Sequence, residues 1–342
     1  MFILYYFVFP FFLSQITIAK KCHLSAGGDR LDVNNPETWK CFADEELHQF
    51  KHTFPYDQLY AKMARPKNGI LFIGDGLSLS TVTGARYLKA TNRGKEVGEE
   101  LLSWDTWPSV SLLRTMDADR MTTDSAAAAT ALFTAHLSGC DCLRTEIVQC
   151  LVDVSLILGT KGIHYTLGLT KGAGCCSCDV INQTHYAQSI LLLAQKQGLS
   201  TGIVTTTRIT HATPAATYAI SPSRQWEAYI DPSAQKNLKE KSQHCLDIAQ
   251  QLIENGIDFN VVLGGGTEMF HGPPTKYSST KIGKRKDGKD LLSEWVQRQT
   301  QKDRRFSLVT NKTQFDAVDI NTTDYLFGKH QCGLNIRFRI RL

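Results

Sequence analysis

The sequence has little net charge and no second long hydrophobic run, and both absences exclude classes of function. Its 38 Lys and Arg residues exceed its 33 Asp and Glu residues only slightly, for a net charge of +5. The basic runs Lys281–Lys289 and Lys302–Arg305 are polar and contain no interleaved aromatic residues. We therefore expect solvated surface there and no nucleic-acid partner. Beyond residues 1–19 no hydrophobic stretch is long enough for a bilayer, so we expect no membrane span in the mature chain.

Residues 1–19 carry no charge, and they end at the small residue Ala19 before two lysines. This pattern predicts a cleaved secretory signal peptide, although the usual early positive charge is missing. A membrane anchor is the alternative, for which the apolar run is short. Asn-x-Thr sequons at Asn182, Asn311 and Asn321 agree with passage through the secretory pathway and predict glycosylation of an extracellular protein.

The cysteine content is high for an intracellular protein. Six of the ten cysteines lie between Cys140 and Cys178, and three of those are nearly contiguous at 175–178. An oxidising compartment and disulfide bonds are the interpretation that we favour. A metal cluster is the alternative, but the spacing matches no usual zinc pattern.

Short apolar runs alternate with helical patterns along the chain. We expect strands at Gly69–Ile73, Gly202–Thr207 and Phe259–Leu263, and helices at Val82–Ala90, 124–137, Ala187–Gln197 and Cys245–Asn255. Such alternation predicts an α/β fold with a mostly parallel central sheet and helices on both faces. Asp75, in a predicted tight turn, the loop after Thr207 and the triple glycine 264–266 would then share the edge of the sheet where ligands bind.

The most informative segment is Met-Thr-Thr-Asp-Ser-Ala-Ala-Ala-Ala-Thr at residues 121–130. Thr123 or Asp124 can cap the helix that the alanines propagate. Ser125 then lies in the first turn, beside free N–H groups and the positive end of the helix dipole, where a phosphate is stabilised. The alternative is a capped and packed helix without chemistry.

Three further segments contain polar residues for which a functional and a purely structural role are both open. Asp75 is a hard ligand for divalent cations, or a turn aspartate that bonds its own loop. His211 and Thr213 are two residues apart on a predicted exposed loop, where they face a hydrated metal or cap a turn. Arg224 offers a planar fork for phosphate oxygens, or is an ordinary surface arginine.

Together these segments resemble the alkaline phosphatases of animals. The matching motifs are Asn68-Gly-Ile-Leu-Phe-Ile-Gly-Asp-Gly76, Asp124-Ser125-Ala126 with its alanine helix, Gly202-Ile-Val-Thr-Thr-Thr-Arg-Ile-Thr-His-Ala-Thr-Pro214, Arg224-Gln225-Trp226 and Val261-Val-Leu-Gly-Gly-Gly266. They cover most of residues 30–139 and 160–328 in the right order. The resemblance implies hydrolysis of small phosphate monoesters with two zinc ions and one magnesium ion.

The resemblance also implies a role for each matching residue. Ser125 would be the nucleophile, activated by zinc coordination, and would form a phosphoserine intermediate. Asp75 would bridge a zinc ion and the magnesium ion, Thr213 would be a magnesium ligand, and His211 would lie next to the magnesium site without binding the ion. Arg224 would clamp the phosphate, and Asp124 would hold its guanidinium. A family disulfide would join Cys178 to Cys245.

The sequence also departs from the family pattern. The family's second half supplies an Asp-x-x-x-His element, an Asp-His pair, a further histidine and a glutamate, whereas the only Asp-x-x-x-His here is Asp44–His48, which comes far too early. We therefore expect residues 20–328 to be the N-terminal part of an alkaline phosphatase domain, incomplete at the C-terminus. Residues 140–159 are interpreted as an atypical insertion and residues 329–342 as a non-family tail. A gene-model error or a retained intron would explain both.

Two hypotheses about function follow. The gene encodes a secreted alkaline phosphatase, a family homodimer whose full-length form is held at the cell surface by a lipid anchor; the signal for that anchor is absent here. This chain lacks most zinc ligands, so for it we favour no activity, as a non-catalytic secreted glycoprotein fragment of the family. Related phosphodiesterases and sulfatases carry threonine or a modified cysteine as nucleophile, and Asp124-Ser125-Ala126 argues against them.

Overall fold

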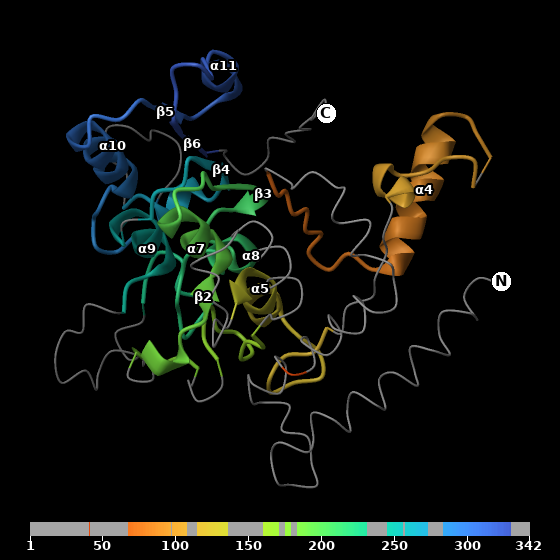
Figure 1. Cartoon of the computed structure of the whole chain (residues 1–342), viewed down its shortest axis with the longest axis horizontal. Coiled ribbons are helices and arrows are strands. Elements are labelled where there is room, and N and C mark those ends of the chain that lie inside the picture. Colours follow the sequence, from red (N-terminus) through yellow and green to blue (C-terminus); the bar gives the residue numbers. More distant parts are fainter. Residues whose placement is uncertain are drawn as a thin grey trace, which may run out of the picture. The chain divides into compact units, whose positions relative to one another are not determined.

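The computed structural model of the 342-residue chain describes a set of separate stretches, which fall into two compact units. The described residues are Cys41, 68–96, 98–107, 115–135, 160–170, 175–178, 183–230, 245–255, 257–272 and 283–329. Residues 68–115 form the short unit, drawn in orange in Figure 1. The main unit contains the described residues from Met116 onward.

The short unit is built around one helix, α4 (Leu79–Asn92), followed by the 3-10 turn η1 (Ser103–Thr106). Ser78 caps α4, because its hydroxyl accepts a hydrogen bond from the Thr81 N–H at 3.2 Å. Arg86 on α4 donates two hydrogen bonds to the Asp105 carboxylate, which ties the 3-10 turn to the helix.

The strand predicted at Gly69–Ile73 is wrong. These residues have no regular secondary structure and pair with no strand of the described chain, and the exposed fractions of Ile70, Leu71 and Phe72 are 73%, 55% and 59%. The tight turn predicted after them is present: Leu77 N–H donates to the Gly74 carbonyl at 3.0 Å, and Gly76 has a φ of 67°. The turn forms because it needs only neighbouring residues, whereas a strand needs a partner.

The main unit contains the parallel sheet that the alternation of strands and helices predicts. Its order is β3 (Gly202–Arg208), β4 (Val261–Gly265), β6 (Tyr325–Lys329) and β5 (Phe306–Val309), and every neighbouring pair is parallel. A separate antiparallel pair joins β1 (Thr134–Ala135) to β2 (Gln188–Ser189). The first two strands of the sheet agree with the predicted runs to within two residues.

Helices of the main unit pack around this sheet (Figure 1). They are α5 (Ser125–Phe133), α7 (Ile190–Lys196), α8 (Ala212–Ala215), α9 (Ile248–Glu254), α10 (Leu291–Gln301) and α11 (Lys312–Asp316), with 3-10 turns η3 (Gln183–His185) and η5 (Thr267–Met269). One hydrophobic core joins buried residues of α5, α8, α9 and α10 to β3, β4 and β6. The helix predicted at 124–137 ends earlier, at Phe133, because Thr134 turns to an extended conformation and enters β1.

The end of β4 lies against the end of β3 because three glycines leave room there. A Cβ on Gly264 would be 2.6 Å from the Thr205 side chain, and one on Gly266 would be 2.8 Å from the Arg208 side chain. Gly266 also has a φ of 88°, which favours glycine. The predicted meeting of the triple glycine with the loop after Thr207 is therefore confirmed, and it fixes where the chain leaves β3.

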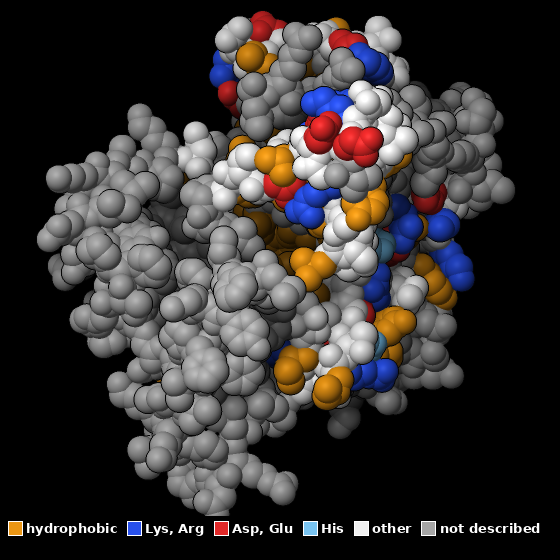
Figure 2. Space-filling model, turned by 90° about the vertical axis from the view of Figure 1, so that its right-hand side faces the viewer, with side chains coloured by type: hydrophobic (Ala, Val, Ile, Leu, Met, Phe, Trp, Pro, Cys, Tyr) orange, Lys and Arg blue, Asp and Glu red, His pale blue; other side chains and the backbone are white. Residues whose placement is uncertain are grey.

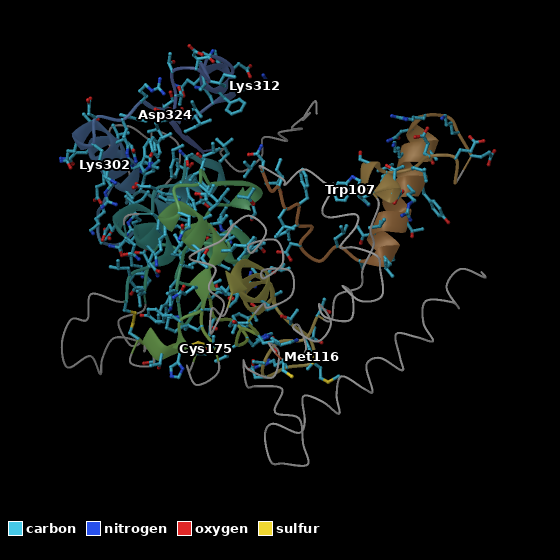
Figure 3. The ribbon with its side chains drawn as sticks, in the orientation of Figure 1. Trp107, Met116, Cys175, Lys302, Lys312 and Asp324 are labelled. Carbon is cyan, nitrogen blue, oxygen red and sulfur yellow. A yellow bond between two sulfur atoms is a disulfide. The ribbon has the colours of Figure 1, made fainter. Side chains whose placement is uncertain are left out.

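Most of the described residues of the two basic runs are exposed, as predicted, and Arg285 is the exception. Arg285 is fully buried, and its guanidinium donates to both carboxylate oxygens of Asp247, at 3.1 and 2.9 Å. Lys302, labelled in Figure 3, pairs with Asp258, which also binds Arg304. Asp247 lies 38 residues from Arg285 and Asp258 lies 44 residues from Lys302, so the basic runs alone do not reveal these two pairs.

Two disulfides of the main unit have both of their cysteines among the described residues. One joins Cys178 to Cys245, the pair that the family resemblance implies, and the other joins the neighbours Cys175 and Cys176. Asn311 and Asn321 are exposed. No helix in the described part of the chain has the length and apolar composition for a bilayer span. The predictions on residues 1–19, Asp44–His48, Asn182, 140–159 and 330–342 lie outside the described residues.

Candidate active site

The start of α5 is organised by Asp124. This residue is the N-cap of the helix, and its carboxylate accepts hydrogen bonds from the N–H groups of Ala126 at 3.2 Å and Ala127 at 3.1 Å. Ser125, which follows it, is the first helical residue and is partly buried. Of the two predicted cap residues, Thr123 and Asp124, it is Asp124 that caps the helix. Ser125, the candidate nucleophile, lies in the first turn as predicted.

Arg224 lies beside this helix start, although it is distant in the sequence. Its Nη1 donates to Asp124 Oδ2 at 2.9 Å, and its Nη2 is 3.1 Å from His211 Nε2. Because a guanidinium can only donate, the Nε2 atom of His211 must be the acceptor. The structure thus brings Asp124, Arg224 and His211 together, next to Ser125.

The Asp124 carboxylate is held ionised by this surrounding. Burial by itself raises its pKa, but hydrogen bonds from the N–H groups of Ala127 and Tyr165 and from Arg224 more than offset burial. The pKa of Asp124 therefore lies below its ordinary value. A permanent negative charge fixes the orientation of the arginine fork.

His211 and Thr213 are not on an exposed loop, which corrects the sequence prediction. His211 stands at the N-cap position of the one-turn helix α8, and Thr213 is inside that helix, with both residues partly buried. Helices α5 and α8 pack against each other. Local sequence did not reveal α8, because Pro214 inside a four-residue helix resembles a turn.

Glu227 stabilises the chain just before α8, because it binds Arg208 and Thr210. Arg208 donates to its two carboxylate oxygens at 2.8 and 2.7 Å, and the Thr210 hydroxyl donates to it at 2.6 Å. Burial raises the pKa of Glu227, but the hydrogen bonds from Arg208 and Thr210 and the charge of Arg208 lower it by more, so the net shift of this pKa is downward. The ion pair joins the end of β3 to the loop that carries Arg224. Sequence reasoning missed Glu227, because nothing local marks it.

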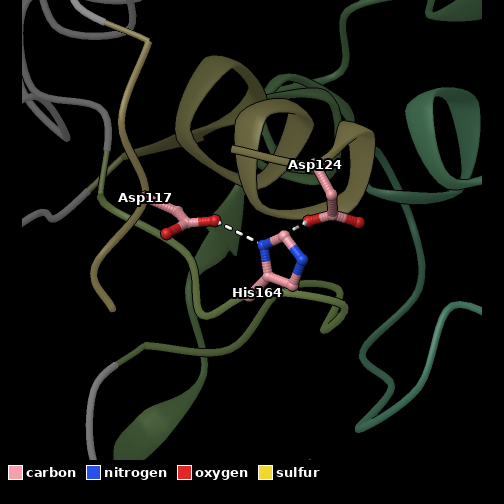
Figure 4. A group of neighbouring side chains, drawn as sticks. All are labelled: Asp117, Asp124 and His164. Atoms are coloured by element: carbon pink, nitrogen blue, oxygen red, sulfur yellow. Dashed lines mark hydrogen bonds and ion pairs between the residues drawn. The ribbon is translucent and has the colours of Figure 1, made fainter. Parts of the chain in front are cut away.

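A second histidine, His164, lies close to Asp124 (Figure 4). Its Nδ1 is 2.7 Å from Asp117 Oδ2 and 3.9 Å from Asp124 Oδ1, and the Asp117 side chain is fully buried. The backbone N–H of His164 donates to Asp119 at 2.9 Å. Sequence reasoning missed this group as well, since Asp117 and His164 are 47 residues apart and match no motif.

These three side chains are the one candidate metal-binding group of histidine, cysteine or acidic residues in the described stretches. Their ligand atoms lie within 4.8 Å of one another. The two oxygens of Asp124, however, already accept four hydrogen bonds, from Ala126, Ala127, Tyr165 and Arg224. A carboxylate has about four acceptor positions, so a cation would have to displace one of these donors.

The metal ligands that the resemblance implies lie on other elements. Ser125 begins α5, and His211 and Thr213 lie at the start of α8, so that His211, the one imidazole among them, is not part of the group of Asp117, Asp124 and His164. Asp75 is exposed in the turn of the short unit. The donors in the described residues therefore do not fit a centre of two zinc ions and one magnesium ion, because a zinc ion takes three or four protein ligands.

Comparison with known proteins places this arrangement in a family. The sequence model of the family "Alkaline phosphatase" matches residues 66–341. A tissue-nonspecific alkaline phosphatase of Gallus gallus is 32% identical over 323 residues, which are 92% of this chain and 55% of the relative. An alkaline phosphatase of Gadus morhua is 35% identical over 273 residues, 77% of this chain and 50% of the relative. The chain spans about half the length of the curated relatives that it matches.

Solved structures give a weaker likeness. A cold-active alkaline phosphatase from a Shewanella species aligns with a TM-score of 0.48 and 21% identity, over 76% of this chain and 44% of that one.

Proposed function

Because the chain belongs to the alkaline phosphatase family, we propose that the whole protein hydrolyses phosphate monoesters. In this proposal Ser125 is the nucleophile and Arg224 binds the phosphate. The observation that carries the proposal is the ion pair between Arg224 and Asp124 at the start of α5, immediately before Ser125.

Three features of this helix start favour a bound phosphate. Arg224 supplies a planar cation whose fork matches two phosphate oxygens, while Asp124 and His211 hold its two terminal nitrogens in place. The start of α5 adds the positive end of the helix dipole. The ionised Asp124 carboxylate already occupies the N–H groups of Ala126 and Ala127 and would repel a phosphate there. In this proposal the phosphate therefore binds the guanidinium N–H groups of Arg224 that point away from Asp124.

The reaction would take place in two displacements at phosphorus. In the first, Ser125 Oγ forms a bond to phosphorus and the ester P–O bond breaks. The proton of the serine hydroxyl is transferred to the alcohol that leaves. In the second, water attacks the phosphoserine, inorganic phosphate leaves, and the serine regains its proton. The two zinc ions and the magnesium ion that the resemblance implies would activate the serine in the family, but the donors described above do not fit them.

That misfit favours a second candidate for this chain, a non-catalytic glycoprotein of the same family. Both candidates bind phosphate through Arg224, and only the first turns a monoester over. Binding and turnover are therefore measured separately.

Calorimetric titration of inorganic phosphate tests the binding step. We expect Arg224→Ala to weaken binding at least about tenfold, because a charge-assisted hydrogen bond is removed. Arg304→Ala is the matched control, since Arg304 has a similar exposure, 21% against 19% for Arg224, and also pairs with one aspartate. Equal affinities of the two variants would overturn the proposed phosphate site.

Turnover of p-nitrophenyl phosphate at alkaline pH, with zinc and magnesium added, then separates the two candidates. Activity that Ser125→Ala abolishes supports the phosphatase, and mass spectrometry of an acid-quenched reaction should find the phosphoryl group on Ser125. Phosphate binding without turnover supports the non-catalytic candidate.

We also propose that the protein is secreted through the signal at residues 1–19, is glycosylated and forms a homodimer of the family type. Asn311 and Asn321 are exposed, as a glycosylation site requires. Glycosidase treatment of the secreted protein, followed by size-exclusion chromatography with light scattering, tests all three.

A further inference from the structure

Tyr165 has an unusual backbone conformation for its residue type. Its φ is 66°, in the left-handed region that favours glycine, and 43% of its side chain is exposed. A large side chain in that region costs about 1–2 kcal/mol. Such outliers persist only where the surroundings impose them, and they gather at functional sites.

Tyr165 lies in a tight turn, in which the Thr166 N–H donates to the Ile163 carbonyl at 3.1 Å, and two residues of the proposed phosphate site hold this turn in place. The Tyr165 N–H donates to Asp124 Oδ1 at 3.1 Å, and the Tyr165 carbonyl accepts from the Arg224 N–H at 2.9 Å. On the C-terminal side, Leu167 and Ser221 exchange two backbone hydrogen bonds, at 2.8 and 2.9 Å. The backbone at Tyr165 is thus fastened to the site on both sides.

The result is an exposed aromatic ring beside the arginine. The Cζ atom of Arg224 is 5.9 Å from the centroid of the Tyr165 ring, and the His164 ring lies 4.9 Å from it, tilted by 57°. The tyrosine therefore borders the place where the fork of Arg224 would hold a phosphate. A group attached to that phosphate lies within reach of the ring.

We propose that the Tyr165 ring is a wall of the substrate site and gives it a preference for phosphate monoesters whose organic part is a flat aromatic ring. Aryl phosphates and nucleoside monophosphates share this chemistry. Stacking of a flat ring on an aromatic side chain is favourable and tolerates different ring systems, whereas an alkyl group gains less. This proposal rests on the phosphate site of the proposed function.

Calorimetric titration in a Ser125→Ala background, which prevents turnover, tests the preference. The probes are inorganic phosphate, ethyl phosphate, phenyl phosphate and adenosine monophosphate. Tyr165→Gly and Tyr165→Asn remove the ring but tolerate the left-handed backbone, so both should fold. Tyr165→Phe keeps the ring.

We expect phenyl phosphate to bind about fivefold more tightly than ethyl phosphate, and this ratio to fall to about one in the Gly and Asn variants. The Phe variant should keep the ratio, and affinity for inorganic phosphate should change less than about twofold in all three. Tyr87→Ala, which removes a comparably exposed ring in the short unit, should change nothing. A gain for adenosine monophosphate as large as for phenyl phosphate would extend the preference to nucleotides, and a gain for phenyl phosphate alone would restrict it to aryl esters.

The outcomes separate the proposed aromatic wall from the proposed phosphate site on which it rests. If inorganic phosphate does not bind, or binds equally well without Arg224, the proposed function fails, and the aromatic wall fails with it. If phosphate binds through Arg224 but the ratio is near one, or survives in Tyr165→Gly, only the aromatic wall is overturned.

Discussion

Residues 68–76 and 121–130 both carry family motifs, yet only the second segment is built into a core. In the main unit, Ala126 and Ala127 are buried, and every oxygen of the Asp124 carboxylate is hydrogen-bonded. In the short unit, the apolar run before Asp75 is exposed. Figure 2 shows, on one face, hydrophobic side chains interspersed with charged ones. The backbone hydrogen bonds of a capped helix come from its own residues, while those of a strand need a neighbouring strand.

The two groups of residues in the proposed site differ in which contacts hold them in place. The phosphate-binding half, with Asp124, Arg224, His211 and Tyr165, is assembled by contacts within the main unit. Asp75, the metal ligand that the resemblance implies, belongs to the short unit, and its segment has no strand partner among the described residues. We therefore expect the two groups to respond very differently to substitution.

The largest effect should come from the core of the main unit. Phe327 on β6 is 1% exposed and lies edge-on to Phe270, with ring centroids 5.9 Å apart. We expect Phe327→Ala to lower the free energy of unfolding by about 3–5 kcal/mol, since a large cavity forms. Urea unfolding followed by circular dichroism measures this. A loss below about 1 kcal/mol would mean that the sheet is not the folded core described above.

A smaller effect should follow from removing the cap of α5. Asp124→Ala deletes the cap and leaves Arg224 without its carboxylate, so we expect a loss of about 1–2 kcal/mol and a weaker phosphate affinity. Asn311→Ala is the control, because Asn311 caps the exposed helix α11 by accepting a hydrogen bond from the Gln314 N–H, without an arginine in this cap. Its expected loss is at most about 1 kcal/mol, with unchanged phosphate binding. Equal behaviour of the two variants would remove the special role of Asp124.

The pH dependence of stability should isolate the charge of Asp124. Because its pKa is lower in the folded protein than in the unfolded chain, its charge stabilises the fold fully above about pH 4, and this contribution is lost as the pH falls through the folded-state pKa. Asp124→Asn keeps a good cap but cannot titrate. The stability difference between wild type and Asp124→Asn, from urea unfolding, should therefore shrink between pH 5 and pH 3. A difference that grows over this range would contradict the assignment.

The sequence predicted the parts of this fold that depend on nearby residues. The capped helix at Ser125, the tight turn at Asp75 and the strand at Gly202 each follow from spacing or residue type. The Arg224–Asp124 ion pair followed from the family resemblance alone, since the two residues are 100 positions apart. The groups that pattern reasoning missed, Asp117 with His164 and Glu227 with Arg208, meet only in the folded chain. The left-handed backbone of Tyr165 carries no sequence signal, because tyrosine rarely adopts it.

The smallest effect is expected in the segment where sequence and structure disagree. Phe72 is 59% exposed, so Phe72→Ala should change the free energy of unfolding by less than about 0.5 kcal/mol, far less than the same substitution at Phe327. The same urea unfolding experiment measures both variants side by side. A loss of 2 kcal/mol or more at Phe72 would show that residues 69–73 are buried in solution, as the family motif predicts. Asp75 would then be carried by a paired strand, and its role as a metal ligand would gain the structural support that it lacks.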